Sequence, residues 1–276
     1  MSALFTIPIA PVGPHVGGSI TCTQPQPKVY LLSWSSPPDN RITTPFCRAL
    51  VSCLDLLEFG GYEPGVVVTT SAIQKFYSNG LDLGHAVETE GFWALLYEVW
   101  ARFLTFPMPT VSLMNGHTFA GGFMLAICHD YRLAPSPRGL ICLNEIVFGA
   151  PLKPAMAAIF RPKIPAAAYR TLVLEAKRFN AQEALAAGLV DAVAEKGLED
   201  ALKLIEERGL TEKAKSGVYG TIKAEMYNET LRYLRSPGMD QEEDRFQAVQ
   251  KREEERREFG KVWVEGWKQE NAKAKL

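Results

Sequence analysis

The segment MPTVSLMNGHTFAGGFMLAICHDYRLA, residues 108–134, decides the fold. A short apolar run ends at an Asn-Gly pair, and a second turn at Gly121 and Gly122 opens a run rich in small side chains. This order predicts a buried strand, a turn, a helix over 119–127 and a second strand over 130–134. Small residues at a helix start let a ligand touch the backbone, where free N–H groups carry partial positive charge. The same residues also suit tight packing of a helix on a strand, so both interpretations stay open here.

Strand–turn–helix units of this kind repeat through the first two thirds of the chain. A hairpin over 19–33 and a β-branched strand over 65–71 precede the segment, and helical periodicity dominates the last third. We therefore expect one α/β fold with short parallel strands. It divides into a loose N-terminal arm over 1–18, a core over 19–195 and a helical region over 196–276.

Composition excludes several classes of protein. With 276 residues and 47% hydrophobic side chains, the chain can bury a real core and is not wholly disordered. A net charge of −1 removes the electrostatic reason to expect a nucleic acid partner. No apolar run reaches the roughly 20 residues of a membrane span. The five cysteines and four histidines show no metal-binding or C-x-x-C spacing, so we expect a reducing compartment, no disulfide framework and no metal site.

A second turn of interest lies in KFYSNGLDLGHA, residues 75–86. Gly80 allows a sharp backbone turn, and Asp82 stands where it would cap a following helix. The N–H groups of such a turn can hold a negatively charged oxygen. An ordinary strand-to-helix turn would have the same sequence. Paired with the turn at Gly121, it could supply two donors of an oxyanion hole.

A single carboxylate stands in the apolar segment GLICLNEIVFGAPLKP, residues 139–154. Apolar surroundings disfavour the charged form, so the pKa of Glu145 should rise. A raised pKa suits a general acid or base near neutral pH. A capping or solvent-facing glutamate is an equally good interpretation of this segment alone.

These three segments, in this order, resemble the crotonase (enoyl-CoA hydratase/isomerase) superfamily. FYSNGLDL, NGHTFAGGFMLAICHDY and NEIVFGAP are most similar to the Δ3,Δ2-enoyl-CoA isomerases of plant and fungal peroxisomes, and AQEALAAGLVDAV at 181–193 matches a further family pattern. The similarity covers about 19–193. It implies a crotonase-like spiral of ββα units, a C-terminal helical region that mediates trimerisation, and an acyl-CoA thioester as substrate.

The resemblance also implies roles for individual residues. Two backbone N–H groups, of Leu81 and Gly121, would form the oxyanion hole. The coenzyme A portion would run along Lys75, Ser78, Asn79, Gly80, Asp82 and Gly122. The acyl chain would lie against Phe123, Met124, Phe148 and Trp93, although these four suit a hydrophobic core at least equally well.

The chain departs from the family's hydratases at one position. Hydratases use two glutamates, and the first of these corresponds here to Met124, whereas the second corresponds to Glu145. A double-bond shift needs one carboxylate, which takes a proton from C2 and returns one to C4. We therefore expect an isomerase without metal or redox cofactor. Alternatives are a hydratase or dehydratase acting on a specialised acyl-CoA, and a catalytically silent member that binds acyl-CoA.

The last residues, Ala274-Lys275-Leu276, are a close variant of the S-K-L peroxisomal address. Residues 1–18 lack the basic residues of a transit or signal peptide. Chance occurrence at the end of a charged helix is the alternative. We predict a peroxisomal protein of fatty acid β-oxidation that binds an import receptor and assembles as a homotrimer or a dimer of trimers.

Overall fold

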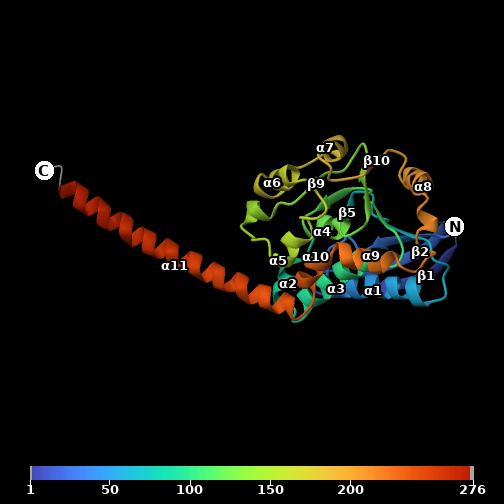
Figure 1. Ribbon diagram of the computed structural model, residues 1–276, viewed down its shortest axis with the longest axis horizontal. Coiled ribbons are helices and arrows are strands. Elements are labelled where there is room, and N and C mark those ends of the chain that lie inside the picture. The colour runs from blue at the N-terminus through green and yellow to red at the C-terminus, as the bar shows by residue number, and fades with distance from the viewer. Residues whose placement is uncertain (1, 274–276) are drawn as a thin grey trace.

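Two sheets organise the chain in a computed structural model that describes residues 2–273 (Figure 1). The larger sheet has seven strands in the order β1-β2-β3-β4-β6-β8-β10, and the smaller has three in the order β5-β7-β9. The strands are β1 (Ala3–Ile9), β2 (Gly18–Gln26), β3 (Val29–Ser35), β4 (Val66–Ser71), β5 (Phe76–Ser78), β6 (Thr110–Leu113), β7 (His117–Phe119), β8 (Tyr131–Pro135), β9 (Ile141–Cys142) and β10 (Ala192–Ala194).

Three successive units each place one strand in each sheet. The pairs are β4 and β5, β6 and β7, and β8 and β9, and helices follow each pair. Neighbouring units join through parallel pairings, β4 with β6 and β6 with β8 in the larger sheet, and β5 with β7 and β7 with β9 in the smaller one. This is the spiral of ββα units that the sequence predicts, with short parallel strands.

Helices cover both faces of the larger sheet. The main hydrophobic core includes buried residues of α1, α3 and α4, and a second, smaller core lies under α8. The α helices are α1 (Thr44–Phe59), α2 (Leu83–Glu88), α3 (Phe92–Thr105), α4 (Gly121–Ile127), α5 (Pro154–Ala158), α6 (Ala166–Leu174), α7 (Ala181–Ala186), α8 (Leu198–Glu207), α9 (Tyr219–Met226), α10 (Asn228–Leu234) and α11 (Gly238–Lys273), and two 3-10 helices are η1 (Glu145–Phe148) and η2 (Leu210–Glu212).

The N-terminal segment is not a loose arm. Residues Ala3–Ile9 form β1, which pairs antiparallel with β2 from Ala3↔Thr23 to Ile9↔Gly18. Its apolar side chains Phe5 and Ile7 pack on the main core, which explains why the strand docks although it lies at the edge of the sheet. The core therefore begins before residue 19.

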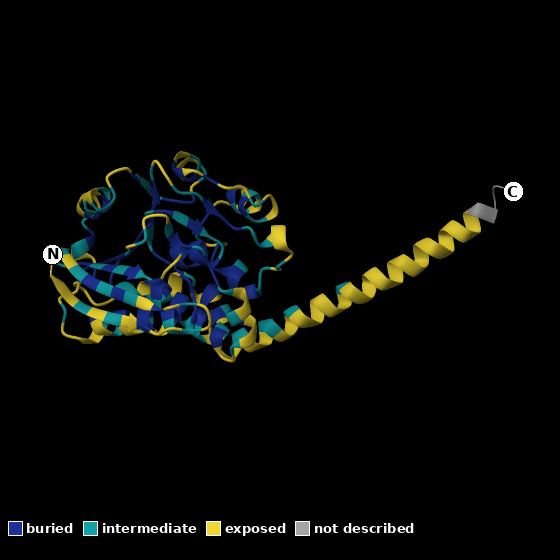
Figure 2. Cartoon of the chain, turned by 180° about the vertical axis from the view of Figure 1, so that it is seen from behind, coloured by how far each residue is buried: buried dark blue, intermediate teal, exposed yellow. Residues whose placement is uncertain are grey.

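The last helix leaves the body of the molecule. Figure 1 shows α11 as a projecting arm, and Figure 2 shows that most of its length is exposed. The predicted helical region over 196–276 contains α8, η2, α9, α10 and α11, and Lys223 of α9 is buried in an ion pair with Asp130 at 2.9 Å. No helix within residues 2–273 is both long and apolar enough to cross a membrane.

Candidate active site

One cavity of about 440 Å³ brings together the three sequence segments that carry chemistry. Asn79 and Leu81 come from the turn after β5, Gly121 and Met124 from the start of α4, and Glu145 from η1. β5, β7 and β9 are neighbours in the smaller sheet, so the segments that follow their last residues meet at one edge. The spiral therefore places these segments together although they are far apart in the sequence.

Two backbone N–H groups, of Leu81 and Gly121, point to an anion site. Neither donates a hydrogen bond to an acceptor within the described residues. A Cβ at Gly121 would lie 3.2 Å from the Leu81 nitrogen, and a Cβ at Gly80 would lie 3.2 Å from the Gly121 nitrogen. The two turns are therefore in backbone contact, which only glycine allows at these positions. Two free donors this close together have the arrangement of an oxyanion hole.

The second turn is fixed from behind by a neighbouring strand. The Ala120 N–H donates to the Cys142 carbonyl at 2.9 Å, and Ala120 has a φ of 48°, in the left-handed region that a residue with a side chain rarely adopts. Its carbonyl accepts from Phe123 and Met124, the first bonds of α4. This strained residue turns the chain so that the Gly121 N–H, at the start of α4, has no acceptor within the described residues.

Glu145 is the carboxylate of the cavity. It begins η1, its Oε2 atom is buried, and that atom has no hydrogen-bond partner in the part of the chain that the structure describes. Burial raises the pKa of Glu145 to about 7, and backbone hydrogen bonds lower it by less. A carboxyl group with this pKa can both take and give a proton near neutral pH.

Glu145 shares the cavity lining with two cationic side chains, those of Arg41 and Lys153. Among the described lining residues it is the only carboxylate, and Met124, which the family resemblance places at the first hydratase glutamate, presents an apolar side chain. Asn144 also lines the cavity, and its buried Oδ1 atom lacks a partner among residues 2–273. The site can thus shuttle one proton beside a stabilised oxyanion.

The structure places three of the four residues predicted for the acyl pocket on the cavity. Trp93, Met124 and Phe148 line the cavity, but Phe123 does not. Phe123 is fully buried and faces Phe160, with ring centroids 5.9 Å apart. Every residue of α4 is buried, so the sequence has no polar face from which to tell the cavity side from the core side.

Several residues assigned to coenzyme A lie outside the cavity lining. Lys75 is exposed at the opposite end of β5, over the ring of Phe76. Ser78 is fully buried, and a Cβ at Gly122 would lie 2.5 Å from its carbonyl oxygen, so both serve packing. Asp82 caps α2 by accepting from the His85 N–H and also contacts His15 at 2.6 Å, and these bonds lower its pKa.

The sequence did not reveal the far wall of the cavity. Phe246 lines it from α11, the helix that otherwise projects into solvent. Lys153, another lining residue, bonds Glu243 of α11 at 2.6 Å and lies 4.9 Å from the ring centre of Trp93. These contacts fix the first turns of α11 over the cavity, and no local motif signals them because they join distant segments.

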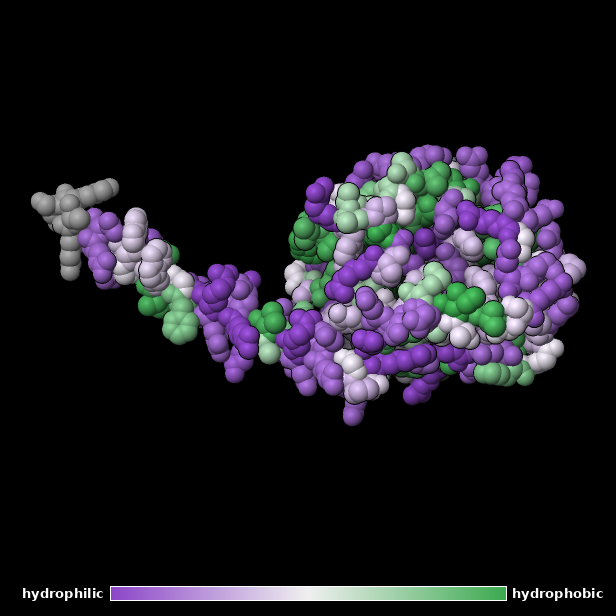
Figure 3. All heavy atoms as spheres, viewed as in Figure 1, coloured by the Kyte–Doolittle hydropathy of each residue, from purple (hydrophilic) through white to green (hydrophobic). Residues whose placement is uncertain are grey.

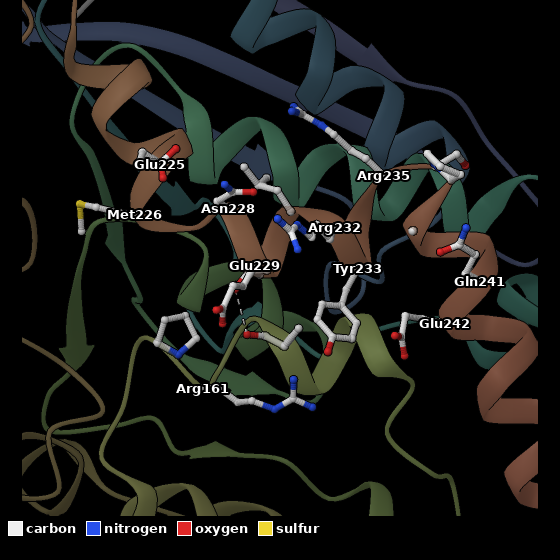
Figure 4. A pocket seen from close by; sticks show the side chains of 17 residues that line it. Arg161, Glu225, Met226, Asn228, Glu229, Arg232, Tyr233, Arg235, Gln241 and Glu242 are labelled. Atoms are coloured by element: carbon white, nitrogen blue, oxygen red, sulfur yellow. Dashed lines mark hydrogen bonds between the residues drawn. The ribbon is translucent and has the colours of Figure 1, made fainter.

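A second hollow in the described part of the chain is larger than this cavity. A groove of about 1240 Å³ runs beside α10 and the start of α11, lined by Arg161, Glu229, Arg232, Tyr233 and Glu242 among others (Figure 4). It holds none of the three motifs and opens to solvent between charged side chains. We place the chemistry in the smaller cavity, because that one holds the free donors and the desolvated carboxylate.

The sequence is similar to known proteins of one family. The family model described as enoyl-CoA hydratase/isomerase matches residues 28–270. Enoyl-CoA delta isomerase 3 of Arabidopsis thaliana is 30% identical over 75% of this chain and 91% of its own length. Enoyl-CoA delta isomerase 2, peroxisomal, of the same plant is 30% identical over 73% of this chain and 89% of its own.

A solved structure supports the fold. A probable enoyl-CoA hydratase of Mycobacterium tuberculosis superposes with a TM-score of 0.72 at 24% identity, covering 84% of this chain and 98% of that one. Most of the spiral and the helices that follow it are therefore shared with that protein.

Proposed function

The chain belongs to the enoyl-CoA hydratase/isomerase family, the crotonase superfamily, and we propose that it moves the double bond of a 3-enoyl-CoA thioester to give 2-trans-enoyl-CoA. Membership of the family, with named enoyl-CoA delta isomerases among the relatives, supports an enzyme that acts on enoyl-CoA thioesters. The observation that carries the finer proposal is the cavity itself, which combines two free N–H donors with one desolvated carboxylate and has Met124 where the family resemblance places the first hydratase glutamate.

The reaction follows from these groups. The thioester carbonyl oxygen accepts hydrogen bonds from the N–H groups of Leu81 and Gly121. The Glu145 carboxylate removes a proton from C2, and the electron pair moves onto the carbonyl oxygen to give a dienolate that the two donors stabilise. Protonated Glu145 then returns a proton to C4, and the pair flows back to form the C2–C3 double bond. The base is regenerated, so the proposal requires no metal or redox cofactor, and coenzyme A enters as part of the substrate.

Turnover assays separate the candidate reactions. Purified enzyme supplied with a 3-enoyl-CoA should form the conjugated 2-trans thioester, with little 3-hydroxyacyl-CoA from 2-trans-enoyl-CoA. Hydration at the rate of isomerisation would instead assign a hydratase. Binding of both thioesters without turnover of either would assign a silent acyl-CoA-binding protein.

We propose that the chain assembles as a homotrimer or a dimer of trimers, as the family resemblance implies, and that the distal half of α11 carries a surface that assembly buries. Figure 3 shows hydrophobic residues among hydrophilic ones along this arm, and Phe259, Val262, Trp263 and Trp267 are 76%, 72%, 68% and 53% exposed. Their spacing puts them on one stripe of the helix. A second copy of the chain would bury them. Charged replacements at Trp263 and Trp267 should lower the mass that sedimentation equilibrium measures, and an unchanged mass would count against this stripe.

We also propose a peroxisomal location and a role in β-oxidation. The support is the Ala274-Lys275-Leu276 terminus, which lies outside the described residues, and the printed name of one plant relative. Deletion of Leu276 should move the protein to the cytosol and leave its activity in vitro intact, because an import receptor reads the free terminus. Cells without other copies of the protein are required. Unaltered peroxisomal targeting, or delivery to mitochondria, would refute the address.

A further inference from the structure

The loop between β3 and α1 is hydrogen-bonded to β5 and to the turn that carries Leu81. Four consecutive residues of this loop, 39–42, bond to β5 and to the residues that follow it. Asn79 N–H donates to the Asp39 carbonyl at 2.9 Å, and Ile42 N–H donates to the Gly80 carbonyl at 2.9 Å. Arg41 Nη1 donates to the Leu81 carbonyl at 3.1 Å.

Asn40 makes the largest share of these hydrogen bonds. It is fully buried, and its side-chain Nδ2 donates to Ser71 Oγ at 2.7 Å and to the carbonyls of Phe76 and Tyr77 at 3.0 and 3.1 Å. Its own carbonyl accepts from Ser78 Oγ at 2.8 Å, and that hydroxyl accepts from the Gly80 N–H at 3.1 Å. Asn40 thus contacts strand β5 directly and is linked to the turn through the Ser78 hydroxyl, without lining the cavity.

The backbone shape of Asn40 serves the same contacts. Its φ is 55°, and its Oδ1 accepts from the Ser36 N–H at 2.8 Å while its N–H donates to the Ser36 carbonyl at 2.9 Å. Asparagine tolerates the left-handed region better than most residues with side chains. The tight turn at Ser36 directs the next residues, including Ile42, towards Gly80.

These bonds decide where the Leu81 N–H points. A trans peptide is planar, so its C=O and N–H point in opposite directions. The Gly80 carbonyl and the Leu81 N–H belong to one peptide, and the Ile42 N–H holds that carbonyl. Fixing the carbonyl therefore fixes the donor on the other side. The bond also polarises the peptide and strengthens the donor.

We propose that Asn40 is a positioning residue for catalysis, which holds loop 39–42 against β5 so that the Leu81 N–H faces the thioester oxygen. This inference rests on the proposed function of the cavity. It assigns to Asn40 an effect on the reacting carbonyl, although its side chain never reaches substrate.

The first test removes the side chain while keeping the backbone. Asn40→Gly accepts the positive φ without strain. We expect kcat to fall about tenfold to a hundredfold, a part of what loss of an oxyanion donor costs. The affinity for hexanoyl-CoA, measured by titration calorimetry, should change less than about threefold, because most of that binding does not use the donor.

Infrared spectra of a bound, unreactive thioester measure how strongly the N–H donors bond to its carbonyl oxygen, without any turnover. With hexanoyl-CoA carrying carbon-13 at the thioester carbonyl, the wild type should show a carbonyl stretch lowered by hydrogen bonding, and Asn40→Gly should lose part of that lowering. Normal lowering in a wild type that fails to isomerise would refute the proposed reaction alone. A wild type without lowering, or an Asn40→Gly variant with unchanged lowering and kcat, would overturn the role of Asn40.

The control variant is Asn115→Ala. Asn115 holds the turn after β4 through the Ser71 carbonyl at 2.9 Å and makes no bond to residues 76–81. It should lower the melting temperature without changing the carbonyl stretch. If Asn40→Gly does not fold, Ser78→Ala removes only the hydroxyl link between Asn40 and Gly80. A smaller loss of kcat and of carbonyl lowering in Ser78→Ala supports the proposal, and no change in either refutes it.

Discussion

The two sides of the cavity are built in opposite ways. On one side, the carbonyls of Gly80 and Leu81 and the side chain of Asn79 bond to loop 39–42, whereas the Leu81 N–H has no acceptor within the described residues. On the other side, η1 leaves Glu145 Oε2 and Asn144 Oδ1 without partners among the described residues. The residues after Glu145, Ile146, Val147 and Phe148, are exposed.

This difference fits the proposed chemistry. A donor that stabilises an oxyanion works best when its direction is fixed before the reaction, because reorienting it would add to the barrier. A base that takes a proton from C2 and returns one to C4 must reach two positions and must stay desolvated. The hydrogen bonds that fix the Leu81 turn therefore suit the donor side. A desolvated Oε2 atom without a partner among the described residues suits the base, Glu145.

The strongest test of this contrast is Glu145→Gln, which keeps the shape of η1 and removes the proton acceptor. General acid–base catalysis contributes about 10²–10⁴-fold, so we expect kcat for isomerisation to fall by about a thousandfold. The affinity for hexanoyl-CoA should stay within a few-fold of the wild type. A variant that turns over normally would remove Glu145 from the mechanism.

A steric clash between the two turns should disrupt the donor side of the cavity. In Gly121→Ala the new Cβ would lie 2.8 Å from Leu81 Cγ and Cδ2 and 3.2 Å from the Leu81 nitrogen, so the two turns must separate. Displacing a donor should lower kcat by about a hundredfold. Gly84→Ala is the matched control, because its Cβ would meet only Asp82 Oδ1, at 3.5 Å. Equal activity of both variants would show that the spacing of the turns is irrelevant.

The sequence predicted the donor side better than the opposite wall. Gly80 and Gly121 stand where backbones touch, and Glu145 stands out in an apolar run, so local chemistry identifies them. Strands β5 and β7 have three residues each, too few for a periodic pattern, and the predicted helix over 119–127 includes the last residue of β7. Asn40 and Phe246 act through contacts with distant segments, which no single-sequence pattern encodes.

The pKa of Glu145 makes a third prediction, about stability. Folding raises this pKa from 4.5 to about 7, so the native state prefers the neutral form. The stabilising contribution is complete below pH 4.5 and is lost as pH rises through 7. Glu145→Gln carries no charge, so its free energy of unfolding should exceed that of the wild type by up to about 3 kcal/mol above pH 7. Urea titrations at pH 4 and pH 8 measure the difference.

Catalysis should depend on pH in the opposite direction from stability, because activity should increase as the pH rises. The base acts in its ionised form, so kcat/KM should rise tenfold per pH unit up to about pH 7 and then level off. A variant distant from the cavity, Glu254→Gln on the exposed part of α11, should show neither effect. A pH-independent stability difference between Glu145→Gln and the wild type would contradict the desolvation of this carboxylate.

The smallest effect is expected at Phe246, where the helix α11 closes the cavity. Phe246→Ala lengthens the space beyond Met124 and Phe148 without touching the donors or Glu145. Each methylene that a hydrophobic pocket accommodates contributes about 1–3 kcal/mol of binding free energy. A new opening to solvent would reduce this contribution. We therefore expect kcat/KM to shift several-fold towards longer acyl chains, with kcat on the best substrate nearly unchanged.

Phe259→Ala separates this effect from a general disturbance of α11. Phe259 lies on the same helix but is 76% exposed and outside the cavity lining. Its loss should leave the chain-length profile of a series of 3-enoyl-CoA substrates unchanged, provided that sedimentation gives both variants the same mass. If the two variants shift the profile equally, α11 acts through assembly and Phe246 is not a wall of the acyl site. If only Phe246→Ala shifts it, the helix that projects from the body also sets the length of chain that the proposed base and donors can process.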